Sequence, residues 1–320
     1  MHRALWPILS AALFLIAAGT APAATPAEVA HAEQLYNDGK FKESITVLDA
    51  YLKEHPSDAT ALVDRGDDYE ALGDHQTAIA DYTAALAANP DYAYAYASRC
   101  ESYFHIDQDA RGLEDCNKAI ELEPKLAYAY RVRARIDLDQ GNPQAALSDA
   151  NEALTISPSS ATALVSRCRA YSALGQYANA LADCTSASTI NPSLDTAFFY
   201  RGRTKYLQED YKASIADFNT ALRLDPTDNN AYYWIAKANL NMGSYADALK
   251  SADQYIASDE DDADGHLLRA QIEVKLGNTA EARSSAQTAL KHYHIVNDES
   301  GAAKAQALID SLGAAAPQGR

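Results

Sequence analysis

The four cysteines are the residues of this chain whose type and spacing first suggest chemistry. Cys100 and Cys116 lie sixteen residues apart, and Cys168 and Cys184 have the same separation. Paired thiols can form a disulfide, ligate a metal, or pack as small apolar side chains in a core. Zinc is the weakest of these interpretations, because each pair offers two thiolates and no nearby histidine completes a set of four ligands.

A second spacing recurs beside the cysteines and relates arginine to aspartate. Five such pairs are also sixteen residues apart: Arg65/Asp81, Arg99/Asp115, Arg133/Asp149, Arg167/Asp183 and Arg201/Asp217. Where the aspartate is replaced by Ser251, the arginine is replaced by Ile235. The coincident loss predicts contact, within a repeat or between neighbouring repeats. A structural series of ion pairs is the favoured interpretation, and ligand binding by these arginines is the alternative.

The rest of the sequence offers no catalytic constellation. The eight histidines are scattered, and no glycine-rich phosphate loop, nucleophile elbow or metal-ligand spacing occurs. The acidic run Asp259–Gly265 imitates the start of a calcium loop, but Gln271 stands where a bidentate carboxylate is needed. We interpret that run as a turn whose carboxylates cap the next helix. We therefore expect no catalytic residue, no metal site and no cofactor, so that the protein is not an enzyme.

The elements that position these residues come from a 34-residue repeat. Its register starts at residues 25, 59, 93, 127, 161, 195, 229 and 263, with no insertion or deletion. We number positions within a repeat as slots. Slots 8 and 20 are always small, glycine occupies slot 15 six times, and proline occupies slot 32 six times. Glycine ends a helix cheaply and proline stops one, so each repeat is predicted to be two antiparallel helices, which makes the fold all-α.

Two segments carry a resemblance to a known family. They are "DRGDDYEALGDHQTAIADYTAALAANP", Asp64–Pro90, and "SRCRAYSALGQYANALADCTSASTINP", Ser166–Pro192. Their small residues, tyrosine, glycine, alanine and proline resemble the tetratricopeptide repeat family, over about 85% of the chain. The resemblance implies a right-handed α-solenoid of about eight repeats over residues 24–296, with a concave groove that binds peptides or partner proteins. We expect a capping helix at 297–313 and a flexible tail at 314–320.

The first residues predict export. His2 and Arg3 precede the apolar stretch Ala4–Ala18, and Ala21-Pro22-Ala23 fits a cleavage site, so residues 1–23 read as a signal peptide. No lipid-attachment cysteine is present, and we expect a location in the bacterial periplasm, without membrane insertion after cleavage. An uncleaved N-terminal anchor is the alternative. The net charge of −17 disfavours nucleic acid and anionic membranes as partners.

In this setting the cysteine pairs favour two disulfides, Cys100–Cys116 and Cys168–Cys184, each bracing one helix hairpin. The first cysteine of each pair occupies slot 8 and the second occupies slot 24. Slot 20 is expected to face slot 8, so slot 24 lies one helical turn beyond. That offset could take the Cα atoms past the limit of about 7 Å for a disulfide. Two small apolar core residues therefore remain an alternative interpretation.

The predicted groove carries the binding hypothesis. In this family the first helix of each repeat lines the concave face, and slot 9 changes from acidic in the first three repeats to basic in the next four. Aromatic residues and arginine are enriched at binding hot spots. The candidate groove residues are Tyr94, Tyr128, Arg131, Arg135, Arg169, Phe199, Tyr200, Arg203, Tyr206, Tyr233, Trp234 and Lys237.

These residues suggest a non-catalytic scaffold or adaptor that binds a peptide or partner protein in the concave groove. The line of basic side chains favours an extended or acidic segment as the ligand. A cell-envelope assembly factor that stacks glycan or peptidoglycan strands on the aromatic rings is the second hypothesis. The alternative to both hypotheses is a purely structural role, in which some aromatic side chains fill the core between repeats and the arginines form a solvated face.

Overall fold

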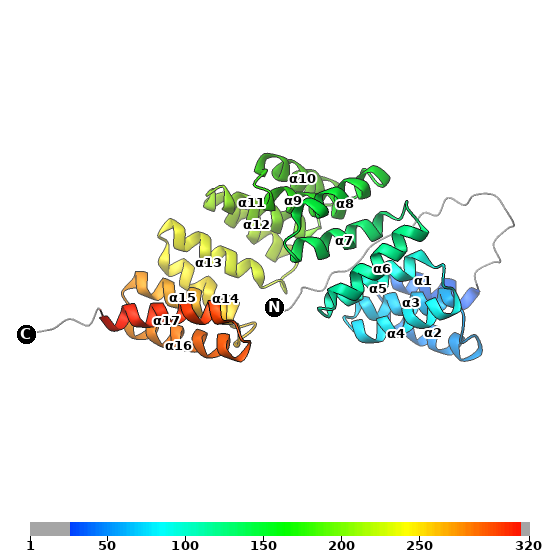
Figure 1. Ribbon diagram of the computed structural model, residues 1–320, viewed down its shortest axis with the longest axis horizontal. Helices are drawn as coiled ribbons and strands as arrows, with labels where there is room; N and C mark the ends of the chain where they lie inside the picture. The colour runs from blue at the N-terminus through cyan, green and yellow to red at the C-terminus, as the bar shows by residue number, and fades with distance from the viewer. Residues whose placement is uncertain (1–25, 315–320) are drawn as a thin grey trace, which may run out of the picture. The chain divides into compact units, whose positions relative to one another are not determined.

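The computed structural model describes residues 26–314. The predicted signal peptide lies outside the described residues, as do residues 315–320 of the predicted tail. Every regular element within the described range is an α-helix, and there are seventeen of them (Figure 1). The predicted all-α class and the helix hairpin of each repeat are confirmed.

The helices alternate between first and second helices of successive repeats. The first four repeats contain α1 (Ala27–Asn37), α2 (Phe41–Glu54), α3 (Ala59–Ala71), α4 (His75–Ala88), α5 (Ala93–His105), α6 (Asp109–Leu122), α7 (Ala127–Asp139) and α8 (Pro143–Ile156). The next four contain α9 (Ala161–Ala173), α10 (Tyr177–Ile190), α11 (Asp195–Leu207), α12 (Tyr211–Leu224), α13 (Asn230–Met242), α14 (Tyr245–Ile256), α15 (Ala263–Leu276) and α16 (Thr279–Ile295). The last helix, α17 (Glu299–Ala314), packs against α16.

The helices divide into two compact units. The boundary falls inside α9, between Ser166 and Arg167. We call residues 26–166 the N-terminal unit and residues 167–314 the C-terminal unit, and each is described by itself.

The turn inside each hairpin keeps one backbone conformation whether or not glycine is present. The six glycines of slot 15 have φ between 73° and 79°, in the left-handed region. In the third and sixth repeats the same slot holds Asp107 and Glu209, with φ of 59° and 63°. The hairpin therefore imposes a left-handed residue on side chains that disfavour it.

The small slots allow the two helices of a hairpin to approach closely. Slot 8 contacts slot 20, since the Ser44 hydroxyl donates to the Ala32 carbonyl at 3.0 Å. Slot 8 also contacts slot 24, because a Cβ added to Gly66 would lie 2.6 Å from the Tyr82 ring. Residues four apart lie on one face of a helix, so slots 20 and 24 flank slot 8 together. A glycine in slot 8 thus makes room for a buried aromatic ring in slot 24.

Candidate partner-binding site

The recurring arginines and aspartates form the predicted ion pairs. In all five pairs the arginine donates through Nε and Nη2 to both carboxylate oxygens, at 2.6–2.9 Å. Each aspartate side chain is at most 10% exposed. Such bidentate, half-buried pairs are stronger than the exposed ion pairs of a typical surface.

Three of these arginines also donate a hydrogen bond to a side chain of the preceding repeat. Arg65 Nη1 donates to Asp49 at 2.7 Å, and Arg133 Nη1 donates to Asn117 at 2.6 Å. Arg99 uses the hydroxyl of Thr83 in the same way, at 3.0 Å. These guanidinium groups therefore join two repeats, and their donors are used inside the fold. The structural interpretation of the series is supported over the ligand-binding one.

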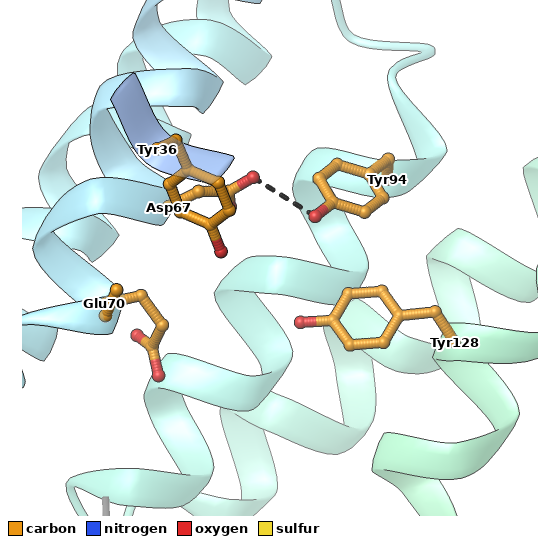
Figure 2. Close-up of a pocket in the computed structure, with 6 residues that line it drawn as sticks. Tyr36, Asp67, Glu70, Tyr94 and Tyr128 are labelled. Carbon is orange, nitrogen blue, oxygen red and sulfur yellow. Dashed lines mark hydrogen bonds between the residues drawn. The ribbon is translucent and has the colours of Figure 1, made fainter. Parts of the chain in front are cut away.

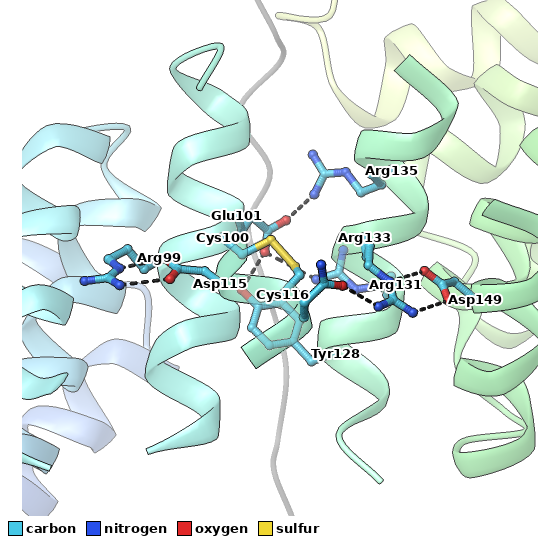
Figure 3. Close-up of a disulfide and its surroundings, with 11 residues drawn as sticks. Arg99, Cys100, Glu101, Asp115, Cys116, Tyr128, Arg131, Arg133, Arg135 and Asp149 are labelled. Carbon is cyan, nitrogen blue, oxygen red and sulfur yellow. Dashed lines mark hydrogen bonds and ion pairs between the residues drawn. A yellow bond between two sulfur atoms is a disulfide. The ribbon is translucent and has the colours of Figure 1, made fainter. Parts of the chain in front are cut away.

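The cysteine pairs are bonded in the structure, and Figure 3 shows Cys100–Cys116 between α5 and α6. The Cα atoms are 5.6 Å apart in this pair and in Cys168–Cys184. The expectation that slot 24 could lie too far from slot 8 was wrong, because in both hairpins the second helix places slot 24 directly beside slot 8 of the first helix. All four cysteine side chains are fully buried. Each bridge closes a hairpin at its centre.

Beside this disulfide, one buried carboxylate gathers two cations of the predicted groove. Glu101 is 2% exposed, and its oxygens form ion pairs with Arg131, at 3.4 Å, and with Arg135 (Figure 3). The Tyr128 hydroxyl donates to Glu101 at 2.6 Å. Burial alone would raise the pKa of Glu101, but the charges of Arg131 and Arg135 lower it to about 2. Glu101 therefore offsets one of the two positive charges of Arg131 and Arg135 from within the fold.

A small pocket lies on the first helices of the N-terminal unit. Figure 2 shows its lining, which consists of Tyr36, Asp67, Glu70, Ala71, Tyr94 and Tyr128. Asp67 accepts hydrogen bonds from Tyr82 at 2.7 Å and from Tyr94 at 3.1 Å. Glu70 accepts one from Ser102. Tyrosine and carboxyl side chains thus line the pocket, and two of them, Tyr94 and Asp67, are hydrogen-bonded to each other.

Three carboxyl groups of α3 are hard to ionise. Burial, reinforced by the neighbouring carboxylates, raises the pKa of Asp64 to about 8. Burial raises the pKa of Asp67 to about 7, against the hydrogen bonds from Tyr82 and Tyr94. The pKa of Asp68 is raised to about 7, chiefly by burial. This region is therefore less negative at neutral pH than its composition suggests.

The C-terminal unit alternates cations and aromatic rings along its first helices. We call Arg169, Tyr200, Arg203, Trp234 and Lys237 the cationic face. The guanidinium carbons of Arg169 and Arg203 lie 4.6 Å and 5.7 Å from the centroid of the Tyr200 ring. Arg203 also lies 4.8 Å from the centroid of Trp234, and the Lys237 ammonium lies 4.7 Å from the same centroid. Each ring is shared by two cations of successive repeats.

Lys237 has the most distinctive environment on this face. Its ammonium also lies 5.1 Å from the centroid of Tyr233 and 5.8 Å from that of Tyr206. Burial lowers the pKa of Lys237, partly opposed by the charge of Asp264. Asp264 does not pair with Lys237, and its carboxylate accepts a hydrogen bond from Tyr293. Among the described residues, no side chain forms an ion pair or hydrogen bond with Lys237.

The predicted groove residues fall into both units. Tyr94, Tyr128, Arg131 and Arg135 belong to the N-terminal unit, and the other eight belong to the C-terminal unit. Phe199 is 7% exposed and packs edge-on against Phe218, with ring centroids 5.6 Å apart. Its assignment to the groove was wrong, because slot 5 of this repeat points into the core.

Sequence reasoning missed the pocket and the buried carboxyl groups of α3. The signal was present in "DRGDDYE", Asp64–Glu70, where four acidic residues occupy one predicted helix. A helix brings residues three and four apart onto one face, so Asp64, Asp67 and Asp68 were bound to lie close together. What the spacing did not show is that the fold buries these carboxyl groups and that Tyr82 of the same repeat and Tyr94 of the next one donate hydrogen bonds to Asp67.

Within residues 26–314, no group of three or more histidine, cysteine, aspartate or glutamate side chains is arranged to hold a metal ion. Among the helices of residues 26–314, none combines the length and the apolar character that crossing a membrane requires.

Comparison with known proteins agrees with this architecture. A family model described as Tetratricopeptide repeat matches residues 29–93, 63–127, 131–195 and 235–293, and another described as TPR repeat matches residues 202–243. The search of the curated proteins finds no match.

Several solved structures share the fold at low sequence identity. A chain of the crystal structure of the APC/C hetero-tetramer Cut9–Hcn1 is 14% identical, with a TM-score of 0.74, covering 89% of this chain and 55% of that one. This chain therefore spans about half the length of that relative. PilW, described as a widely conserved type IV pilus biogenesis factor, is 18% identical, with a TM-score of 0.55, covering 62% of this chain and 92% of that one. The human IFIT1 dimer with PPP-AAAA is 14% identical, with a TM-score of 0.59, covering 82% and 71%.

The fold and its contacts define a helical-repeat protein whose first helices carry the aromatic and charged side chains. The family matches extend over most of the chain. The chain belongs to the tetratricopeptide repeat family, whose fold is generally a non-catalytic scaffold for protein interactions.

Proposed function

We propose that this protein is an exported, non-catalytic scaffold that binds a segment of a partner protein on the first helices of its C-terminal unit. The observation that carries the proposal is the cationic face, where rings and cations alternate over three repeats. Aromatic residues and arginine are the side chains that most often dominate binding energy at protein interfaces. The proposal of export rests on residues 1–23 alone.

The N-terminal unit is a weaker candidate for the same role. Its two groove arginines, Arg131 and Arg135, are paired with Glu101. Its pocket residues Asp67 and Tyr94 are hydrogen-bonded to each other. Charged groups that are already paired gain little from a ligand, because the ligand must first displace the internal partner.

The test starts from a partner isolated by cross-linking in the native cell envelope and then purified. Its affinity for the full chain is compared with that for Trp234→Ala, which removes the ring between Arg203 and Lys237. We expect a loss of about tenfold or more, as for an aromatic hot spot. Arg223→Gln, on the second helix α12, is the control and should bind like the wild type. Equal affinity of the Trp234→Ala and control proteins would refute the proposed site, provided that thermal unfolding shows both to be folded.

A second function is favoured by the rings around Lys237. Tyr206, Tyr233 and Trp234 could stack sugar rings, which suits a cell-envelope assembly factor that binds glycan or peptidoglycan strands. The likeness to PilW, a type IV pilus biogenesis factor, supports a role in envelope assembly, although it rests on fold. Glycan and peptide arrays probed with the same protein separate the two functions, and preferential binding to glycans would favour the second.

A further inference from the structure

We propose that the pocket of the N-terminal unit binds a primary ammonium group, such as the end of a lysine side chain. The pocket is a different site from the cationic face, so this inference goes beyond the proposed function. Three features of the structure carry it: a lining whose polar side-chain atoms are all oxygen, a carboxylate without an ion-pair partner, and a volume that admits only a small group.

The polar side-chain atoms that line the pocket are all oxygens. Figure 2 shows five side chains around one space that carry a hydroxyl or a carboxylate group: Tyr36, Tyr94, Tyr128, Asp67 and Glu70. Two of the hydroxyl groups already donate their protons, that of Tyr94 to Asp67 at 3.1 Å and that of Tyr128 to Glu101 at 2.6 Å. A hydroxyl group whose proton is used can only accept a further hydrogen bond. The lining therefore favours an occupant that donates several hydrogen bonds.

Asp67 is the carboxylate of this pocket that has no ion-pair partner. It accepts hydrogen bonds from two neutral hydroxyl groups, that of Tyr82 on one oxygen and that of Tyr94 on the other. A lone pair remains on each oxygen, so a ligand need not displace either tyrosine. Burial raises the pKa of Asp67 to about 7, and the negative charges of Glu70 and Glu101 add to this rise. No lysine or arginine within residues 26–314 forms an ion pair with it.

Glu70, the second acid of the pocket, has partners of its own. His75 Nδ1 lies 3.0 Å from its carboxylate, and His105 Nε2 lies 3.7 Å from it. Ser102 donates a hydrogen bond to the same carboxylate. Glu70 therefore forms part of the wall, and Asp67 is the acid that an incoming cation meets without a competing cation.

The volume of the pocket limits the occupant to a small group. Its centre encloses about 10 Å³, which is the room that one water-sized group needs. A primary ammonium group is close to water in size and offers three N–H donors to the surrounding oxygens. A guanidinium group is larger and planar, and a trimethylammonium group is larger and has no N–H donor. A lysine side chain can place its ammonium in such a space while its apolar stem lies against the tyrosine rings.

The effect of Asp67 on stability supports a role in binding. Because folding raises its pKa, the ionised form of Asp67 disfavours the folded state as the pH rises through 7. Asp67→Asn at pH 8.5 should therefore keep or raise the melting temperature while it weakens ammonium binding. A carboxylate with a purely structural role would show the reverse, a lower melting temperature with no change in binding.

The experiment titrates the full chain, at pH 8.5 and low ionic strength, with a Gly-Ser peptide that carries one central lysine. Matched peptides have norleucine, arginine or trimethyl-lysine in its place, and n-butylamine serves as a free amine. Calorimetry reports binding. We expect the lysine peptide to bind about tenfold more tightly than each matched peptide, as for a charge-assisted contact. Equal affinity of n-butylamine assigns the ligand to free amines, and tighter binding of the lysine peptide assigns it to a protein segment.

Variants of the pocket decide where the peptide binds. Asp67→Asn removes the negative charge and should weaken the lysine peptide about tenfold. Ala71→Leu fills the space from the one alanine of the lining and should weaken it as strongly, without changing a charge. Glu33→Gln removes an exposed acid from slot 9 of the preceding repeat and should leave binding unchanged. Thermal unfolding checks that each variant is folded.

Three results would each overturn the inference. The first is equal binding of the lysine peptide and either the norleucine or the trimethyl-lysine peptide. The second is full affinity of the lysine peptide for a folded Asp67→Asn protein. The third is loss of lysine binding when potassium chloride replaces choline chloride at equal ionic strength, which would assign the pocket to an alkali cation. Each would leave the proposed function standing, because Trp234→Ala tests a site in the C-terminal unit.

Discussion

The buried carboxylate Glu101 provides the sharpest test of how this scaffold holds its charges. Replacing it with glutamine keeps the shape but leaves Arg131 and Arg135 without their common counterion. The pKa of Glu101 is about 2, and an unfolded glutamate titrates near 4.3, so its ionised form stabilises the fold by about 3 kcal/mol. We therefore expect Glu101→Gln to lower the unfolding free energy of the N-terminal unit by about 3 kcal/mol at pH 7.

The dependence on pH distinguishes this mechanism from a simple packing defect. Because the folded pKa is below the unfolded one, the contribution is fully present above about pH 5 and is lost as the pH falls towards 2. The difference between wild type and Glu101→Gln should therefore shrink between pH 5 and pH 2. Hydrogen exchange of the amides in α5 and α7, at several urea concentrations, measures the change where it occurs.

The control is Glu33→Gln, which removes an exposed acid from the same slot of the first repeat. It should change stability by less than about 0.5 kcal/mol. The double variant Glu101→Gln, Arg135→Gln should lose less than the sum of the two single variants, because the unpaired cation is removed as well. A loss below about 1 kcal/mol for Glu101→Gln at pH 7, or a difference that does not shrink in acid, would refute this reasoning.

Three further predictions concern stability. Removing one disulfide by Cys100→Ala with Cys116→Ala should cost about 3 kcal/mol in denaturant unfolding, as a loop of this length predicts, and a loss below 1 kcal/mol would contradict it. Asp67, with a folded pKa of about 7, favours folding fully below about pH 4, and this contribution is lost as the pH rises through 7. Asp67→Asn should therefore flatten the loss of thermal stability between pH 5.5 and 8.5, and an unchanged slope would argue against it. Glu209→Gly should raise the unfolding free energy by about 0.5–1 kcal/mol, and with it the melting temperature, because glycine adopts the left-handed conformation without strain. A lower melting temperature would refute this prediction.

The sequence alone determined the repeat and the pairs that lie within it. A 34-residue period with small, glycine and proline slots predicts helix hairpins, because helical spacing and helix breakers are local properties of the chain. The ion pair between Arg99 and Asp115 was predictable for the same reason, since both side chains belong to one hairpin and recur at one spacing. The cysteine pairing was also suggested by recurrence, although the packing of slot 24 beside slot 8 was not foreseen.

Only the tertiary structure decided which charged and aromatic residues are available to a partner. Arg135 and Lys237 occupy the same slot and looked equivalent in sequence, yet Arg135 forms an ion pair with Glu101, whereas Lys237 lies against aromatic rings with the charge of Asp264 nearby. Phe199 was assigned to the groove but packs in the core. The pairing of Arg135 with Glu101 joins neighbouring repeats, and Phe199 is covered by Phe218 on the other helix of its own hairpin, so both outcomes depend on residues distant in sequence. The repeat position and type of a residue can be read from the sequence. The burial of a charged side chain and its ion pairs depend on residues that only the fold brings near it, and they determine whether that side chain is available to a ligand.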